Sequence, residues 1–507
     1  MERHGCHSAT QEYPHPFIHE VKLTSTQRIR GVLLGCVLTP LRVALTVLCF
    51  LVMWPLARLR LAGLSEEARA RPVEGWRRWL LHPFMLWLSR LAFFFLGFLW
   101  VEVKGRRADL KEAPVLVVAP HSSFMDMVVL MPTQLPTVVS RSENTSLPVV
   151  GALLEFNQSV MVSRTDHESR KKAVAQVTER VTSNGYWPQM LMFPEGTTTN
   201  GSALIKFKPG AFLAGLPVQP VLLRYPNKPD TVRWTYKGTS WKQAVWHTTS
   251  QLYTRVTIEF LPVYSPSQEE KDDPNLYADN VQKLMAKALG IPSTAYVMEG
   301  RVPVEKLGGL SLPLESPARK ALKLLRGGGL GAPQLAAALD RMIDRCRSGA
   351  RGSKVSTEEL SLVLGLTDVD TDDAIRDIYS KDETVDLRPL YLTVAALSGC
   401  VGFKPLLHTA FTLFDAEGQS RLSAEELTDL MAALLDFPQR HTAELYAQAA
   451  GCGALTEENL LRVLTTDPTY HRVASEYMRP EEAGSRPADG KTVNNNRSTH
   501  NDNKKFE

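Results

Sequence analysis

The chain has 507 residues, which is too long for one compact domain, so two or three domains are expected. Hydrophobic residues make up 44% of the chain and charged residues 22%, close to the globular average, which excludes general disorder. The net charge of +4 and the pI of about 8.6 exclude a dedicated nucleic-acid-binding protein, yet they suit contact with anionic lipid headgroups.

The cysteines limit the chemistry of the central region. None of the six lies between residues 50 and 345, so that region cannot carry a disulfide or a cysteine metal site. A reducing compartment is therefore expected for most of the chain. The six are Cys6, Cys36, Cys49, Cys346, Cys400 and Cys452.

Two apolar stretches, residues 31–56 and 79–101, follow a polar segment of residues 1–28 that has no cleavable signal pattern. Each has about the 20 residues that a membrane span needs, once one arginine in each is tolerated. The arginine-rich connector between them is typical of a cytosolic loop. We therefore predict membrane-anchoring helices over residues 29–102. Two spans, one span with a re-entrant or interfacial helix, and a pair of buried core helices remain as alternatives.

Alternating strands and helices follow, which predicts an α/β domain over residues 103–300. Residues 114–119 form a continuous apolar run, as in a strand that is buried on both faces. Residues 167–183 repeat apolar side chains with helical spacing, and a second helix is predicted over residues 275–288, between a proline and a glycine. Further strands are predicted over residues 137–140, 160–163, 189–193 and 218–225.

The remainder of the chain changes character. Residues 301–334 are rich in glycine and proline and are predicted to form a linker. Short amphipathic helices dominate residues 335–470, and the polar, asparagine-rich residues 471–507 are predicted to be a disordered tail. The predicted fold class is an α/β catalytic domain with N-terminal membrane helices and an all-α C-terminal domain.

Residues 120–126 (PHSSFMD) follow the predicted buried strand, at the position where α/β folds place reactive groups. An imidazole titrates near neutrality, so His121 can act as a general base on a hydroxyl. Asp126, five residues on, can bind the other ring nitrogen across one turn and stabilise the imidazolium that forms. A surface or capping pair is the alternative for a histidine and an aspartate at this spacing.

Three further blocks lie at or near predicted strands. Residues 193–200 (FPEGTTTN) place a glycine among hydroxyl and carboxylate side chains, which lets a substrate approach the backbone closely. Arg164 follows another strand, and a guanidinium binds phosphate through two parallel hydrogen bonds. An ordinary turn and a surface arginine are the alternatives. Residues 216–221 (LPVQPV) form a structural or acyl-lining segment, and Lys206 and Lys208 add positive charge just before it.

Residues 415–426 have the length of a 12-residue calcium loop that begins with Asp415 and ends with Glu426. The other candidate ligands are Glu417, Gln419 and Arg421, whereas position 6 is Ser420 instead of glycine. Hydrophobic residues comparable to the one at position 8 recur at intervals of 30 to 37 residues, which predicts four EF-hand-like units. These residues are Val355, Val385, Leu422 and Leu455. Two alternatives remain for this region: residues 415–426 bind calcium, or the units are degenerate helical hairpins that are kept for packing.

Together, the blocks around residues 120–126, 162–166 and 193–200, with the apolar block after them, resemble the glycerolipid acyltransferases with the His-x4-Asp motif. More specifically, they resemble the lysophosphatidylcholine acyltransferases. The resemblance extends to an N-terminal membrane segment and a C-terminal region of EF-hand type. It implies that His121 is the base and Asp126 its partner. It also implies that the acceptor glycerophosphate is bound by Arg164, Glu195, Gly196 and Thr197.

The reaction that this resemblance implies is acyl transfer from acyl-CoA to the sn-2 hydroxyl of lysophosphatidylcholine in phospholipid remodelling. Acetyl-CoA as the donor and lyso-platelet-activating factor as the acceptor are further expectations. The implied route has no covalent enzyme intermediate and needs no catalytic metal, and the expected partners are membrane lipids and acyl-CoA, not nucleic acid. A lysophosphatidic acid or glycerol phosphate acyltransferase, and a catalytically inactive calcium-responsive membrane adaptor, are the alternatives.

The chain ends with two lysines, Lys504 and Lys505, at the third and fourth positions from the carboxyl terminus. This ending resembles the dilysine signal that returns membrane proteins to the endoplasmic reticulum. It predicts location in the membrane of the endoplasmic reticulum, or of the Golgi, with the C-terminus in the cytosol.

Overall fold

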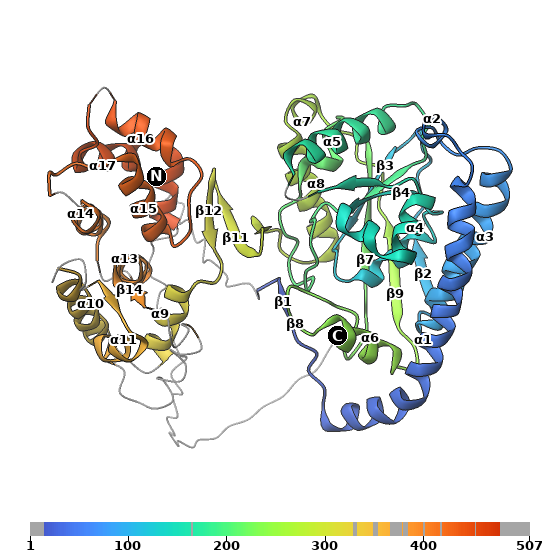
Figure 1. Cartoon of the computed structure of the whole chain (residues 1–507), viewed down its shortest axis with the longest axis horizontal. Helices are drawn as coiled ribbons and strands as arrows, with labels where there is room; N and C mark the ends of the chain where they lie inside the picture. The colour runs from blue at the N-terminus through green and yellow to red at the C-terminus, as the bar shows by residue number, and fades with distance from the viewer. Residues whose placement is uncertain are drawn as a thin grey trace, which may run out of the picture. The chain divides into compact units, whose positions relative to one another are not determined.

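The computed structural model divides the chain into two compact units, residues 1–306 and 307–507 (Figure 1). The residues that the structure describes are 15–163, 166–327, 332–347, 353–365, 378, 384–398, 401–415, 418–451 and 453–476.

The first unit is built on a seven-stranded sheet with the order β2-β9-β7-β3-β6-β4-β5 (Figure 1). Neighbouring strands run parallel, except that β7 and β9 are antiparallel. The strands are β2 (Trp100–Lys104), β3 (Val115–Ala119), β4 (Thr137–Arg141), β5 (Val160–Val162), β6 (Met190–Met192), β7 (Val218–Arg224) and β9 (Arg255–Phe260). The predicted α/β architecture is confirmed, and the apolar run at 114–119 is the central strand β3.

Side chains of β3 alternate between two hydrophobic cores, one on each face of the sheet. Val115, Val117 and Ala119 pack with α5 (His167–Val181) and α8 (Pro274–Leu289). Leu116 and Val118 pack on the other face with the 3-10 helix η1 (Phe124–Leu130). All five residues of β3 are buried, because both faces are covered. The remaining helical segments of this unit are η2 (Ser142–Ser146), α4 (Pro148–Phe156), η3 (Pro209–Ala211), α6 (Trp241–Thr249) and α7 (Gln268–Asp272).

The N-terminal helices differ from the two membrane segments predicted. Helix α1 (Ser25–Leu61) has 37 residues and continues through Pro40 and Pro55. Among the described residues it is the one helix that is long and apolar enough to cross a membrane. Helix α3 (Trp76–Phe95) is joined to α1 through α2 (Glu66–Arg69). It is not apolar enough to count as a membrane-spanning helix, and its 20 residues include three arginines. The end of the second apolar stretch is not membrane helix, because it forms the edge strand β2.

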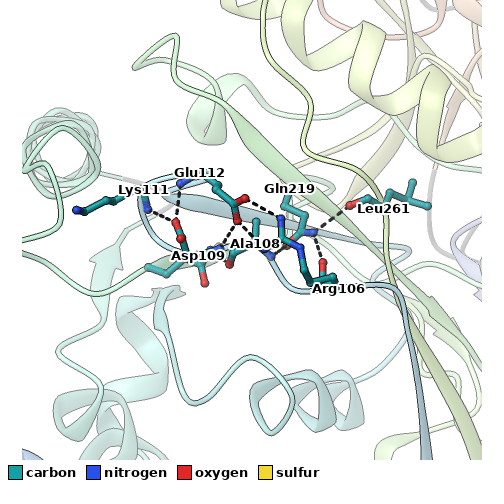
Figure 2. Close-up of polar contacts among 8 residues, drawn as sticks. Arg106, Ala108, Asp109, Lys111, Glu112, Gln219 and Leu261 are labelled. Carbon is teal, nitrogen blue, oxygen red and sulfur yellow. Dashed lines mark hydrogen bonds and ion pairs between the residues drawn. The ribbon is translucent and has the colours of Figure 1, made fainter.

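The side-chain amide of a buried glutamine connects segments at the amino ends of β3 and β7. The sequence motifs follow the carboxyl ends of the strands, on the opposite side of the sheet. Gln219 of β7 is 2% exposed, and its Oε1 accepts from the backbone N–H of Ala108 at 2.8 Å. Its Nε2 donates to the carbonyl oxygens of Arg106 at 2.8 Å and of Leu261 at 3.0 Å (Figure 2). The side chain therefore joins β7, the loop before β3 and the segment after β9.

Replacing Gln219 by Leu is expected to lower the free energy of unfolding by about 3 kcal/mol, because one donor and two acceptors lose their buried partner. Thermal or denaturant unfolding in detergent measures the change. Gln268→Leu is the control, since Gln268 bonds the exposed Asp272 at 3.1 Å within one helix. Equal stabilities of the two variants would contradict this assignment.

The second unit is mostly helical, as predicted. Its helices are α9 (Pro317–Gly327), α10 (Ala332–Arg347), α11 (Thr357–Leu364), α13 (Leu387–Ser398), α14 (Phe403–Phe414), α15 (Ala424–Leu435), α16 (Thr442–Ala450), α17 (Glu457–Thr466) and α18 (Pro468–Glu476). The four recurring hydrophobic residues form two antiparallel pairs: Val355 with Val385, in β13 (Lys354–Val355) and β14 (Val385–Asp386), and Leu422 with Leu455. The first predicted unit is thus paired with the second, and the third with the fourth.

The predicted linker of residues 301–334 contains regular structure. Strand β11 (Val302–Leu307) pairs with β10 (Tyr296–Glu299), and β12 (Leu310–Pro313) and α9 follow. These segments are ordered because they bury apolar side chains, among them Val304 at 0% and Leu312 at 2% exposure. Gly308 and Gly309 form the turn between β11 and β12. The tail beyond residue 476 lies outside the described residues.

Candidate active site

His121 and Asp126 lie together at the carboxyl end of β3. Asp126 is in the first turn of η1, and its Oδ2 lies 2.8 Å from Nδ1 of His121. Ser123 caps η1 through its hydroxyl, and Asp126 closes the capping box. The five-residue spacing therefore brings the two side chains together through one tight turn.

Asp126 is fully buried and accepts hydrogen bonds on both oxygens. Oδ2 accepts from the backbone N–H groups of Ser122 at 2.6 Å and Ser123 at 2.9 Å, and Oδ1 accepts from the hydroxyl of Tyr225 at 2.6 Å. A carboxylate surrounded by donors acts as an acceptor, so Nδ1 of His121 carries the proton in the shared bond. The other ring nitrogen, Nε2, then has a lone pair and can take a proton.

Tyr225 belongs to the site although no motif pointed to it. It follows β7, which lies next to β3, with Ala119 paired with Leu222. Burial and the neighbouring Asp126 raise the pKa of Tyr225 well above its ordinary value, so the hydroxyl stays protonated and donates. The one sequence signal was its position directly after a buried central strand.

Glu195 holds the backbone of His121 from the neighbouring strand. It follows β6 and is 1% exposed, and its Oε2 accepts from the N–H of His121 at 2.5 Å. Its Oε1 accepts from the N–H of Ile205 at 3.3 Å. Burial raises the pKa of Glu195 to about 8, although these two donors act in the opposite direction. The carboxylate thus points into the protein, toward the backbone.

An aromatic ring covers one side of the His121 imidazole. The ring of Phe193 stacks on that of His121 at a centroid distance of 4.2 Å. Only 18% of the His121 side chain is exposed. The ring therefore has one orientation, fixed by Asp126 at Nδ1 and by Phe193 at its face.

Gly196 and Thr197 lie on the outer side of the same loop. Gly196 has a φ of +66°, which favours glycine, and a Cβ atom there would lie 2.9 Å from Cε and Nζ of Lys208. Thr197 is half-buried. Lys206, by contrast, binds Asp279 at 2.8 Å and is directed toward α8. Arg164 lies outside the described residues.

The chain is similar to known acyltransferases over most of its length. An acyltransferase family model matches residues 100–224, the stretch that contains His121, Asp126 and Glu195. Lysophospholipid acyltransferase LPCAT4 of Homo sapiens is 44% identical over 476 residues, covering 92% of this chain and 89% of its own length. Lysophosphatidylcholine acyltransferase 2 of Homo sapiens is 38% identical over 470 residues, covering 92% and 85%.

The chain belongs to the lysophosphatidylcholine acyltransferase family. As a member it is an O-acyltransferase, and a lysophospholipid acceptor and an acyl donor are its substrate classes. Among solved structures, the 1-acyl-sn-glycerophosphate acyltransferase PlsC of Thermotoga maritima covers 52% of the chain with a TM-score of 0.36 and 19% identity.

The candidate calcium loop of this acyltransferase keeps part of the required backbone. Ser420, at the position that glycine usually occupies, has a φ of +58°. The oxygens of Asp415 accept from the N–H groups of Gln419 at 3.2 Å and Ser420 at 2.7 Å, and Glu426 accepts from Ser423 at 2.8 Å.

The side chains of this loop that could bind calcium are described only in part. Glu417 lies outside the described residues. Within the described part of the chain, no three histidine, cysteine or acidic side chains gather as a metal site. Asp415 and Glu426 are the acidic candidate ligands of the loop that the structure describes.

Proposed function

We propose that the chain transfers an acyl group from acyl-CoA to the free sn-2 hydroxyl of a lysophospholipid, with lysophosphatidylcholine as the acceptor. Acetyl transfer from acetyl-CoA to lyso-platelet-activating factor belongs to the same proposal, since a shorter donor changes no step of the chemistry. The observation that carries it is the buried sequence of contacts from Tyr225 through Asp126 to His121, which leaves Nε2 as a base.

Each step of the reaction uses this base. Nε2 of His121 removes the proton from the acceptor hydroxyl while the oxygen attacks the thioester carbonyl carbon. The negative charge of Asp126 stabilises the imidazolium that forms. The C–S bond then breaks, coenzyme A leaves as the thiolate, and the imidazolium returns its proton to the sulfur. The products are the diacyl lipid and free coenzyme A, and no electron donor or acceptor is needed.

Binding of the acceptor glycerophosphate is assigned to the outer side of the loop that begins at Glu195. Lys208 lies against Gly196 of this loop, so its ammonium adds positive charge where the phosphate is proposed to bind. Thr197 adds a hydroxyl, and Arg164 a guanidinium, in this proposal. Glu195 contributes by holding the loop to His121, since its carboxylate is turned inward.

Membrane attachment is proposed to involve one leaflet. Helix α1 contacts the catalytic unit at both ends: Gly35 lies against Trp246 of α6, and Arg58 pairs with Glu155 of α4 at 2.6 Å (Figure 1). The 23 residues between Gly35 and Arg58 span about 34 Å of helix, slightly more than the hydrocarbon thickness of about 30 Å. A transmembrane α1 would therefore require the catalytic unit, which contacts this span near both of its ends, to extend across the hydrocarbon as well. We place α1 and α3 at the membrane surface, with exposed side chains such as Trp79, 78% accessible, facing the lipid.

The proposed location in the cell rests on the dilysine pattern. Lys504 and Lys505 lie outside the described residues, and their dilysine pattern supports residence in the endoplasmic reticulum, with the Golgi as a further site. A one-leaflet attachment puts the catalytic unit and the C-terminus on the same, cytosolic, side.

The second unit is proposed to be a packing module of paired EF-hand-like hairpins. Adding calcium to the purified protein is expected to produce no saturable binding in calorimetry below millimolar concentrations, because position 5 of the loop is Gln419 instead of an aspartate or asparagine and position 6 is Ser420 instead of glycine. The matched control is Glu426→Gln. Saturable binding that this substitution removes would contradict the proposal and make the unit a calcium sensor.

The deciding experiment offers purified enzyme in lipid micelles a panel of lysophospholipids and acyl-CoA chain lengths, with and without a calcium chelator. Transfer to lysophosphatidylcholine is expected to exceed transfer to other acceptors. A preference for lysophosphatidic acid or glycerol phosphate would show that the proposed acceptor is wrong, whereas the proposed mechanism would stand. No transfer to any acceptor, with normal membrane association, would make the chain an inactive adaptor.

A further inference from the structure

The first described residues of the chain, 15–21, lie across two loops of the catalytic unit and are called the strap here. The glutamate loop is residues 195–202, and the tryptophan loop is residues 230–239. In the strap, β1 (Ile18–His19) pairs with β8 (Lys237–Gly238) of the tryptophan loop. Phe17 is fully buried, so its ring anchors the strap in the apolar interior. A segment that looked like a polar terminus is therefore built into the catalytic unit.

Asn200 joins the strap to the glutamate loop. Its backbone N–H donates to the carbonyl of Pro16 at 2.7 Å, and its Nδ2 donates to the carbonyls of His15 at 3.0 Å and Ile18 at 2.9 Å. Its Oδ1 accepts from the backbone N–H and the hydroxyl of Ser202 at 2.9 and 2.6 Å. Every polar group of the amide is therefore engaged. The sequence Asn-Gly-Ser at 200–202 has the form of a glycosylation site, and a glycan on Nδ2 would replace one of its two hydrogens and so remove at least one of the two bonds to the strap.

The tryptophan loop is held by further backbone bonds. The N–H of Lys237 donates to the carbonyl of Phe17 at 3.2 Å, and the N–H of Thr239 donates to that of His19 at 2.8 Å. Gly238 cannot be replaced easily, because a Cβ atom there would lie 2.1 Å from the carbonyl oxygen of His19. The strap thus fixes the two loops relative to each other.

Both loops in turn hold the backbone of the catalytic motif. In the glutamate loop, Thr199 donates its N–H to the carbonyl of His121 at 2.7 Å, and Glu195 accepts from the N–H of His121. In the tryptophan loop, Trp234 donates its N–H to the carbonyl of Ser122 at 2.9 Å. The peptide groups on both sides of His121 are therefore bonded to loops that the strap ties together.

We propose that the strap, through Asn200, positions His121 for proton transfer, so that residues 15–21 belong to the catalytic unit. This inference rests on the proposed acyl transfer. Asn200 does not touch the reacting atoms and is a positioning residue. Displacing the imidazole by about 1 Å relative to the acceptor hydroxyl lowers the rate by about 100-fold without removing a substrate contact.

The test compares Asn200→Ala with Gln158→Ala in the full-length enzyme. Gln158 is a matched control, because its Nε2 donates to the carbonyls of Arg69 and Arg71 and its Oε1 accepts from Val73. It too ties an N-terminal segment to the catalytic unit, but at the amino end of β5, away from His121. Asn200→Ala is expected to lower kcat by about 10- to 100-fold with KM within about 3-fold, whereas Gln158→Ala changes kcat by less than about 2-fold.

Two truncations and a milder substitution keep the test open if Asn200→Ala does not fold. Removing residues 1–21 is compared with removing residues 1–14, and the difference in kcat isolates the strap. Asn200→Ser retains a hydroxyl but lacks the amide donors, and it is expected to fall between wild type and Asn200→Ala. Equal losses of kcat in Asn200→Ala and Gln158→Ala, or unchanged kcat in Asn200→Ala and the longer truncation, would overturn the proposal.

A readout without lipid substrates separates this inference from the proposed function. Diethyl pyrocarbonate modifies neutral imidazole, and mass spectrometry gives the rate at His121 alone. The rate is expected to rise severalfold in Asn200→Ala, because the ring loses its fixed, largely covered position, and to stay at the wild-type value in Gln158→Ala. An unchanged rate at His121 would count against the strap even if the wild-type enzyme transferred no acyl group to the lipids offered.

Discussion

Replacing His121 by Ala is expected to lower kcat/KM for acyl transfer by about 10,000-fold, while the protein stays folded and bound to membranes. The imidazole is the group in the site with a lone pair for the hydroxyl proton, since Asp126 is buried and already accepts four hydrogen bonds. Transfer of radiolabelled acyl-CoA to lysophosphatidylcholine in isolated membranes measures the loss.

His408→Ala is the matched control for this substitution. His408 also bonds a carboxylate through Nδ1, that of Glu457 at 2.9 Å, but it lies in the second unit and 68% of its side chain is exposed. It is expected to retain wild-type activity. More than a tenth of the wild-type rate in His121→Ala would exclude the imidazole as the base and with it the proposed mechanism.

The local parts of the site could be predicted from the sequence. His121 and Asp126 are joined by one turn, so their spacing allowed a bonded pair, and the motifs that follow favoured it over a surface or capping pair. The strand before them, β3, was evident because all five of its residues are apolar. In the structure all five are buried, since both faces of the sheet are covered. Such features depend on neighbours in the sequence and on the burial of a central strand.

The contacts that complete the site were not predictable, because they join distant residues. Tyr225 lies 99 positions from Asp126, and Glu195 lies 74 positions from His121. They meet because β7 and β6 flank β3, and strand order is a property of the whole fold. The proposed role of Glu195 in acceptor binding stays a prediction, and the geometry adds a contact with the His121 backbone that the motif did not indicate.

The edge of the sheet was misread for a different reason. Trp100 begins β2 but also ends a dense apolar stretch, so composition favoured membrane helix up to residue 101. β2 is an edge strand whose side chains are mostly exposed, and its alternation of apolar and charged residues covers only residues 101–104, directly after the apolar stretch. Its partner β9 was missed too, because the β2–β9 pairing joins segments about 150 residues apart.

Replacing Asp126 by Asn is expected to lower kcat by about 100- to 1,000-fold, with a smaller effect on KM. The amide has nearly the same shape, but its two ends are no longer equivalent. Two backbone N–H groups point at the position of Oδ2, so the amide carbonyl must take that place and the NH₂ group must face Tyr225. His121 then keeps a hydrogen-bond acceptor and loses the negative charge that stabilises the imidazolium.

The orientation of the introduced amide makes a second, linked result expected. In Asp126→Asn the Tyr225 hydroxyl has to accept where it donated before, so Tyr225→Phe is expected to cost activity in the wild-type background and little in the Asp126→Asn background. Tyr264→Phe is the matched control, because Tyr264 also donates to a carboxylate at 2.6 Å, that of Glu270, away from the site. Additive effects of Asp126→Asn and Tyr225→Phe, or a loss below about 10-fold in Asp126→Asn alone, would mean that the carboxylate charge does not act on His121.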